Sequence, residues 1–232
     1  MAEMKKYKKI FIAGGGTGGH IYPGIAIARA LQSEQNDCQI FFIGTNQGLE
    51  TKIVPREGFP LLCIQGGKLN FSGQTFSKIS TVFKIPLGIL QSFYFLLRHR
   101  PDFVLGVGGY ASAPMMLAAV FLKFPTAIWE PNAYPGMANR WLARFVDRCF
   151  IVFAAAEKLL ENKNISVFGM PVRAEMEKQI SVRAQQNYTV ENKNDISNPG
   201  PQVPGQFHIL HYGGSQGSRA IGRTLCTAIN DS

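Results

Sequence analysis

Short apolar runs alternate along the chain with longer segments of helical periodicity. Unbroken apolar strands separated by helices are typical of parallel βαβ units whose sheet is covered on both faces. We therefore predict an α/β fold built on a parallel sheet. The predicted strands are Lys9–Ala13, Gln39–Ile43, Leu61–Ile64, Phe103–Val107, Thr126–Trp129, Cys149–Val152 and Ser166–Phe168.

The first helix is expected behind the glycines that follow the first strand. Ile25, Ala28 and Leu31 recur at helical spacing after Pro23. Proline is favoured in the first helical turn because its φ is already suitable and its missing N–H is not needed there. The pattern therefore predicts a helix that begins near Pro23.

One uncharged run, residues 103–122, is as long as a membrane span. Three glycines, Ser112, Tyr110 and Pro114 interrupt it. We interpret the run as a strand, a turn and a helix of a buried core rather than as a span.

The composition changes between residues 181 and 206, which are polar and rich in Asn, Gln, Pro and Gly, as linkers are. A fresh pattern of strand, glycine turn and helix then begins at Phe207. One strand and one helix cannot bury a core of their own. We therefore predict an N-terminal Rossmann-like domain over residues 1–180, a linker over 181–206 and the start of a truncated second domain over 207–232.

The overall composition is that of a globular protein, with 46% hydrophobic and 17% charged residues. None of the four cysteines lies in a C-x-x-C pair, so we expect buried reduced thiols rather than a zinc site or a disulfide framework. The net charge of +9 raises nucleic acid, anionic lipid and phosphorylated ligands as partners. No basic and aromatic recognition motif supports nucleic acid, and we predict none.

Three glycine-rich loops each follow a predicted strand. They are G-G-G-T-G-G-H from Gly14 to His20, G-V-G-G-Y-A-S-A-P from Gly106 to Pro114 and G-G-S-Q-G-S from Gly213 to Ser218. At a helix N-terminus such backbone offers N–H groups and a partial positive charge to an anion. Any one loop could equally be a tight turn, but three in one chain favour a phosphate-rich ligand between two domains.

The first loop fits two familiar nucleotide-binding patterns poorly. Gly14, Gly16 and Gly19 satisfy G-x-G-x-x-G, but the second strand is followed by no acidic residue before Glu50. A dinucleotide fold needs a carboxylate close to the end of that strand. A P-loop needs Lys where this chain has His20. A nicotinamide-dependent oxidoreductase is therefore an alternative that rests on the first loop alone.

Five motifs occur in order: G-G-G-T-G-G-H-I-Y-P-G, L-G-V-G-G-Y-A-S-A-P, E-P-N-A-Y-P-G-M-A-N-R-W-L-A, G-M-P-V-R and G-G-S-Q-G-S-R. Together they resemble the MurG family of glycosyltransferase family 28, from about Lys9 onward and with residues 181–206 unmatched. The resemblance implies a GT-B fold of two Rossmann-like domains. It also implies inverting transfer of N-acetylglucosamine from UDP-N-acetylglucosamine to the C4 hydroxyl of undecaprenyl-pyrophosphoryl-N-acetylmuramyl pentapeptide, which converts lipid I to lipid II in peptidoglycan synthesis.

The resemblance also implies binding residues. Donor contacts fall on Thr17, Gly18, Gly19, Asn132, Arg173 and Ser215, and contacts to the acceptor pyrophosphate on Gly15, Gly16, Gly108, Gly109 and Tyr110. Simpler roles stay open: a helix cap for Thr17, an Asx turn for Asn132 and a surface ion pair for Arg173. The family usually has His and Gln around the Glu of the third motif, where this chain has Trp129 and Pro131.

The catalytic base is expected to be His20 or Glu130. An imidazole titrates near working pH, which suits removal of a proton from the attacking hydroxyl. The alternative for His20 is phosphate binding or capping of the turn. Asp102 is a third candidate, although its position between Pro101 and a strand favours a turn residue. Since there is no D-x-D cluster and helix N-termini can stabilise the departing UDP, we expect no metal and no cofactor.

The region from Gly58 to Pro101 contains no Asp or Glu but five basic residues: Lys68, Lys78, Lys84, Arg98 and Arg100. It carries two apolar helical stripes, one of Phe76, Ile79, Phe83, Leu87, Leu90, Tyr94 and Leu97 and one of Ile85, Ile89, Phe93 and Leu96. A basic helix with two apolar faces suits an anionic bilayer, whereas a core helix with a basic edge is the alternative. Because the family's acceptor is a membrane lipid, we predict peripheral attachment through the Lys68–Arg100 region at the cytoplasmic face of the bacterial inner membrane. A fragment that binds the lipid or the membrane without transferring sugar is the alternative function.

Overall fold

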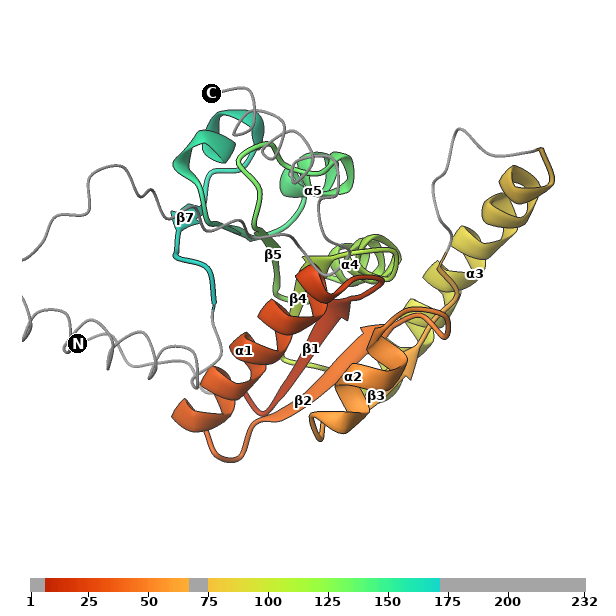
Figure 1. Ribbon diagram of the computed structural model, residues 1–232, viewed down its shortest axis with the longest axis horizontal. Helices are drawn as coiled ribbons and strands as arrows, with labels where there is room; N and C mark the ends of the chain where they lie inside the picture. The colour runs from red at the N-terminus through yellow and green to blue at the C-terminus, as the bar shows by residue number, and fades with distance from the viewer. Residues whose placement is uncertain (1–6, 67–74, 172–232) are drawn as a thin grey trace, which may run out of the picture. The chain divides into compact units, whose positions relative to one another are not determined.

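The computed structural model describes residues 7–66 and 75–171, and among these the side chains from residue 84 onward in the second range. Seven parallel strands form one sheet in the order β3-β2-β1-β4-β5-β6-β7 (Figure 1). They are β1 (Lys9–Gly14), β2 (Gln39–Gly44), β3 (Leu61–Cys63), β4 (Phe103–Gly108), β5 (Thr126–Glu130), β6 (Arg148–Ile151) and β7 (Ile165–Val167). The α/β class and the parallel sheet are confirmed, and every predicted strand end lies within one residue of the observed one.

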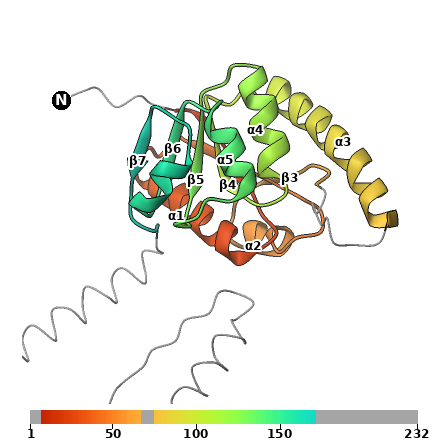
Figure 2. The same ribbon diagram turned by 90° about the horizontal axis from the view of Figure 1, so that it is seen from above.

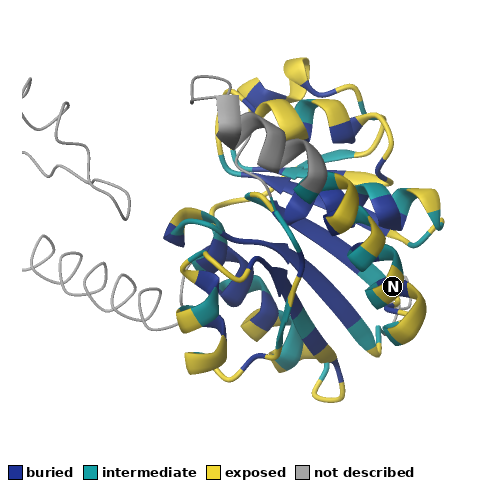
Figure 3. Cartoon of the chain, turned by 90° about the vertical axis from the view of Figure 1, so that its right-hand side faces the viewer, coloured by how far each residue is buried: buried dark blue, intermediate teal, exposed yellow. Residues whose placement is uncertain are grey.

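Helices cover both faces of the sheet (Figure 2). They are α1 (Gly18–Glu34), α2 (Glu50–Arg56), α3 (Thr75–His99), α4 (Ser112–Phe121) and α5 (Met137–Ala143), with a 3₁₀ helix, η1 (Ala154–Leu159), before β7. Buried residues of α1 and α2 share one core cluster, and those of α3, α4 and α5 share another. The central strands lie buried between these layers (Figure 3).

Strand β1 shows why unbroken apolar runs form this architecture. Ile10 and Ile12 belong to the core under α1, whereas Phe11 and Ala13 belong to the core on the opposite face. Successive side chains of a strand point to opposite faces, so a strand covered on both sides needs apolar residues at every position. The continuous apolar pattern therefore reports a sheet between two helical layers.

Helix α1 begins at Gly18, so the predicted start near Pro23 is wrong. Pro23 lies inside the helix, one turn further along. The first residues of α1 include two glycines, which carry no apolar periodicity, and so the pattern concealed the first turn. Thr17 occupies the N-cap position with an extended backbone (φ −131°, ψ 155°).

Residues 103–122 contain β4, a turn and the whole of α4, as predicted. Within the described ranges, no helix combines the length and the apolar character that a membrane crossing requires. The chain divides into two compact units, Met1–Pro171 and Val172–Ser232. The second unit lies outside the described residues, so the linker and the second domain stay predictions.

Candidate functional site

The first two glycine loops meet at the carboxyl edge of the sheet, because their strands β1 and β4 are paired neighbours. The Gly15 N–H donates to the Gly108 carbonyl oxygen at 3.2 Å. Gly109 has a φ of +87°, and a Cβ there would collide with the Gly15 backbone. Glycine is needed at this position both for the left-handed conformation and for the close approach of the two loops.

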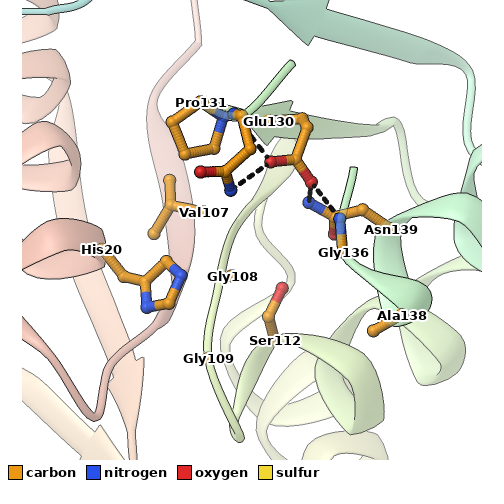
Figure 4. Close-up of a pocket in the computed structure, with 11 residues that line it drawn as sticks. His20, Val107, Gly108, Gly109, Ser112, Glu130, Pro131, Gly136, Ala138 and Asn139 are labelled. Atoms are coloured by element: carbon orange, nitrogen blue, oxygen red, sulfur yellow. Dashed lines mark hydrogen bonds between the residues drawn. The ribbon is translucent and has the colours of Figure 1, made fainter. Parts of the chain in front are cut away.

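His20 projects from the first turn of α1 toward the second loop (Figure 4). Its Nδ1 lies 3.2 Å from Thr17 Oγ1. Burial lowers the pKa of His20 below its usual value of 6.5, while hydrogen bonding to the Gly15 backbone and the charge of Glu130 partly oppose the change. A lowered pKa keeps the imidazole neutral, and so able to accept a proton, near neutral pH.

His20 borders a pocket of about 100 Å³ at the carboxyl ends of β4 and β5. The pocket is lined by His20, Val107, Gly108, Gly109, Ser112, Glu130, Pro131, Asn132, Gly136, Ala138 and Asn139. Ser112, at the start of α4, is buried, and its Oγ has no hydrogen-bond partner among the described residues. The structure thus brings together His20, Glu130 and Asn132 with the glycines of the second loop.

Glu130 is a buried carboxylate at the end of β5. Its Oε1 accepts hydrogen bonds from the Asn132 N–H at 2.9 Å and Nδ2 at 2.8 Å. Its Oε2 accepts from the Gly136 N–H at 2.9 Å and from Asn139 Nδ2 at 3.0 Å (Figure 4). Four donors therefore converge on one carboxylate and hold the loop between β5 and α5.

Glu50 is a second buried carboxylate, and the sequence motifs gave it no role. Its Oε1 accepts from the Thr45 N–H at 2.9 Å and from the Thr45 hydroxyl at 2.8 Å. Its Oε2 accepts from the Gly16 N–H at 2.7 Å. A Cβ at Gly44 or Gly48 would collide with the Glu50 side chain, so the spacing of these glycines around an acidic residue was the available signal.

The predicted binding residues differ in whether their N–H groups are free to bind a ligand. The N–H groups of Gly15 and Gly16, predicted to bind the acceptor pyrophosphate, already donate to Gly108 and Glu50. Thr17, Gly18 and Gly19 lie at the first turn of α1, where helical N–H groups lack intrahelical partners. Tyr110 is 41% exposed and follows the second loop. Arg173 and Ser215 lie outside the described residues.

Asp102 is wrong as a candidate base. Its Oδ2 accepts hydrogen bonds from the N–H groups of Lys8 at 2.8 Å and Lys9 at 2.9 Å. Lys9 is the first residue of β1 and Lys8 precedes it, so Asp102 lies at the amino edge of the sheet, opposite His20. Its carboxylate ties the amino ends of β1 and β4 together.

The cysteines of the described ranges are free thiols. Cys38 and Cys149 are buried, and burial raises the pKa of Cys149 to about 12. Cys63 is exposed, so the expectation of burial is wrong at this position. In the part of the chain that the structure describes, no three His, Cys, Asp or Glu side chains gather as metal ligands would.

Comparison with known proteins gives this geometry a family. The model of the glycosyltransferase family 28 N-terminal domain matches residues 10–151. A Bdellovibrio bacteriovorus protein named UDP-N-acetylglucosamine–N-acetylmuramyl-(pentapeptide) pyrophosphoryl-undecaprenol N-acetylglucosamine transferase is 52% identical over 222 residues, which cover 96% of this chain and 57% of that protein. A Pelobacter propionicus protein of the same name is 40% identical over 225 residues, 95% of this chain and 59% of its own.

A solved structure agrees. The crystal structure of Acinetobacter baumannii MurG superposes with a TM-score of 0.59 at 26% identity, and the match covers 73% of this chain and 47% of that one. The Rossmann-like sheet with its glycine loops therefore defines an N-terminal domain of the GT-B class. The chain belongs to glycosyltransferase family 28. It spans somewhat more than half the length of the curated relatives that it matches.

Proposed function

We propose that the protein to which this chain belongs transfers N-acetylglucosamine from UDP-N-acetylglucosamine to the C4 hydroxyl of lipid I, with inversion. The observation that carries the proposal is the pocket where His20 faces the second glycine loop and the Asn132 loop. Family membership and the names of the relatives support the substrates. Arg173 and Ser215, which lie outside the described residues, are proposed to complete the donor site.

His20 is the proposed general base. Its pKa is lowered by burial, so the neutral ring can take the proton of the attacking hydroxyl. Glu130 competes poorly for this role, because all four of its hydrogen bonds are accepted from protein donors. Its proposed role is to hold Asn132, a predicted donor contact, at the edge of the pocket.

The second glycine loop and the start of α4 are proposed to bind the acceptor pyrophosphate. Gly108, Gly109 and Tyr110 lead into the α4 N-terminus, whose N–H groups and partial charge favour an anion. We do not propose Gly15 and Gly16 as pyrophosphate ligands, because their N–H groups already donate to Gly108 and Glu50. The α1 N-terminus, at Thr17 to Gly19, is left for the donor.

The test is release of UDP when the protein is supplied with UDP-N-acetylglucosamine and a water-soluble lipid I analogue. General base catalysis contributes about 10²–10⁴-fold, so His20→Ala is expected to lose that much turnover. Glu34→Ala, at the exposed far end of the same helix, is expected to keep it. Normal turnover in His20→Ala would remove His20 from the mechanism, and binding of the analogue without UDP release would favour the non-catalytic alternative.

Peripheral membrane attachment through α3 is proposed as the means of reaching the lipid. Leu87, Leu90, Tyr94 and Leu97, members of the first predicted stripe, are 47–64% exposed. Leu96, of the second stripe, is fully buried in the core, so the two stripes face different environments. On the neighbouring α4, Phe121 is 75% exposed. Exposed apolar residues beside Arg98 and Arg100 suit an anionic bilayer.

Sedimentation with anionic vesicles tests this attachment. Burying one leucine side chain is worth about 1.5–3 kcal/mol, so the double variant Leu90→Ser/Tyr94→Ser is expected to bind at least about tenfold more weakly. Leu159→Ser, an exposed leucine of η1, is the matched control. Equal binding of both variants and wild type would place the membrane surface elsewhere. Recovery of the protein at the cytoplasmic side of inner-membrane vesicles would test the proposed location.

A further inference from the structure

The deeply buried Glu50 is not used by the proposed chemistry, yet the fold makes unusual room for it. Its side chain has no solvent exposure. A Cβ at Gly15, Gly44 or Gly48 would overlap atoms of this side chain. Three glycines from two loops thus form a cradle around one carboxylate. Burying a carboxylate is costly unless hydrogen-bond donors surround it, so Glu50 must have such donors in the protein interior.

The donors that satisfy Glu50 come from two separate segments. Thr45, at the end of β2, supplies its N–H and its hydroxyl to one oxygen. Gly16, in the first glycine loop, supplies its N–H to the other oxygen at 2.7 Å. The Thr45 bonds fix the carboxylate, and the fixed carboxylate then holds the loop.

The Gly16 N–H belongs to the same peptide group as the Gly15 carbonyl. Gly15 also donates its N–H to the Gly108 carbonyl oxygen, and the His20 ring lies against Gly108, where a Cβ would collide with it. In agreement with this proximity, hydrogen bonding to the Gly15 backbone raises the pKa of His20. On its other side, Gly15 lies against Gly109 of the second loop. One peptide group therefore lies between the Glu50 carboxylate and the His20 imidazole, at the junction of the two loops.

We propose that Glu50 is a positioning residue for His20. Its carboxylate holds the Gly15–Gly16 peptide in one orientation, and that peptide sets the direction of the imidazole in the pocket. The carboxylate also fills the concave side of the first loop, which excludes a phosphate from the Gly16 N–H and leaves phosphate binding to the two helix N-termini. The catalytic relevance of this arrangement rests on the proposed function, but the arrangement itself does not.

The variant Glu50→Gln tests the inference with readouts that need no substrate. Glutamine keeps the volume of the side chain but has only one acceptor oxygen. We expect that oxygen to stay with the two Thr45 donors, so the amide N–H₂ faces the Gly16 N–H and the hydrogen bond to Gly16 is lost. In the complete 232-residue chain, we expect the Gly16 amide proton to move upfield and its hydrogen exchange to accelerate at least about tenfold, because it loses a charge-assisted hydrogen bond. We also expect the His20 ring to titrate at lower pH, since the Gly15 hydrogen bond that raises its pKa is weakened.

The control is Glu34→Gln, the same charge change at the exposed end of α1. If Glu50→Gln matches this control in the Gly16 amide shift and in the His20 titration, the inference is overturned. If Glu50→Gln does not fold, Thr45→Val deletes one of the three hydrogen bonds and leaves the carboxylate in place. Movement of both signals in Thr45→Val supports the inference, and unchanged signals overturn it.

Turnover separates this inference from the proposed function. If wild type releases UDP, Glu50→Gln is expected to lower kcat about 10–100-fold with KM changed by less than about threefold, because a misdirected base slows the chemical step more than binding. A raised KM with normal kcat counts against a positioning role. Absence of UDP release by wild type contradicts the proposed function and leaves the two magnetic resonance signals to decide the role of Glu50.

Discussion

Two buried carboxylates at the carboxyl edge of the sheet hold different kinds of structure. Glu130 accepts its four hydrogen bonds from Asn132, Gly136 and Asn139, none more than nine positions away. Glu50 accepts from nearby Thr45 but also from Gly16, 34 positions away in the sequence. Glu130 organises its own loop, whereas Glu50 ties one loop to another.

The two carboxylates therefore have different structural roles, one within a loop and one between loops. Each carboxylate satisfies backbone N–H groups that would be costly to bury unpaired. A local carboxylate holds the conformation of its own loop. A carboxylate between two loops controls how those loops meet, and here they meet beside His20.

Glu130→Ala is expected to cost the most stability. It leaves the N–H groups of Asn132 and Gly136 and the amide of Asn139 without their acceptor. An unpaired donor costs about 1–3 kcal/mol where it is buried, as Asn139 is, and less at the exposed residues Asn132 and Gly136. Because the fully buried Glu130 side chain is removed as well, the free energy of unfolding should fall by about 3–5 kcal/mol in urea denaturation. Glu161→Ala, at a side chain 74% exposed, should change it by less than about 0.5 kcal/mol. A loss below about 1 kcal/mol for Glu130→Ala would show that water replaces the carboxylate.

Gly109→Ala is expected to come next, because it acts where the two loops meet. Its φ of +87° disfavours alanine, and the new Cβ would strike Gly15. The free energy of unfolding should fall by about 2–4 kcal/mol. Gly136→Ala is the matched control: its φ is −59°, and its Cβ would lie 3.8 Å from the Glu130 carboxylate. Equal losses in thermal unfolding would mean that the contact between the loops carries no special cost.

Glu130→Gln should shift the titration of His20. The negative charge of Glu130 partly offsets the lowering of the His20 pKa by burial. Removing that charge should therefore lower the pKa further, which a magnetic resonance titration of the imidazole ring measures. The base must be neutral to act, so activity should decline as the pH falls through this pKa, below 6.5, and the decline should move to lower pH in the variant. A titration that stays in place or moves upward would mean that Glu130 does not act on His20 through its charge.

The smallest expected effect is a change in the reactivity of Cys63 when the charge on Glu50 is removed. Although Cys63 is exposed as a residue, partial desolvation of its thiol raises the pKa of that thiol, and the Glu50 carboxylate raises it further. Glu50→Gln should lower that pKa and speed alkylation by iodoacetamide, by less than about tenfold, as the thiolate fraction grows. Mass spectrometry of the Cys63 peptide measures the rate, with Glu130→Gln as the unaffected control. No acceleration would mean that the Glu50 side chain does not act on Cys63 through its charge.

Much of the fold could be predicted because its signals are local. The six residues of β1 are enough to predict a strand, because they are almost all apolar. Several such strands together predict the parallel sheet. The start of α1 was misplaced because Gly18 and Gly19 carry no apolar pattern. Part of the site could also be predicted from short motifs. His20 comes directly after the glycines of the first loop, and Glu130 and Asn132 are two positions apart in one motif.

The remainder depends on contacts between distant segments. Asp102 had the right chemistry for a base, but the direction of β4 puts it at the opposite edge of the sheet from His20. Glu50 follows β2 too late to be the ribose carboxylate of a dinucleotide site, yet its position at the start of α2 brings its side chain to the Gly16 N–H of the first glycine loop. Neither position could be deduced from spacing along the chain.

The class of fold, the strands to within one residue and the family could all be predicted from the sequence, because apolar periodicity and glycine motifs are properties of short segments. Only the tertiary structure decided which N–H groups of the loops are already occupied and which carboxylates are buried. The physical reason is that a hydrogen bond between Gly16 and Glu50 depends on the packing of β1, β2 and α2 in space. Sequence motifs name the groups that a site contains, and packing determines which of them are free to bind a ligand.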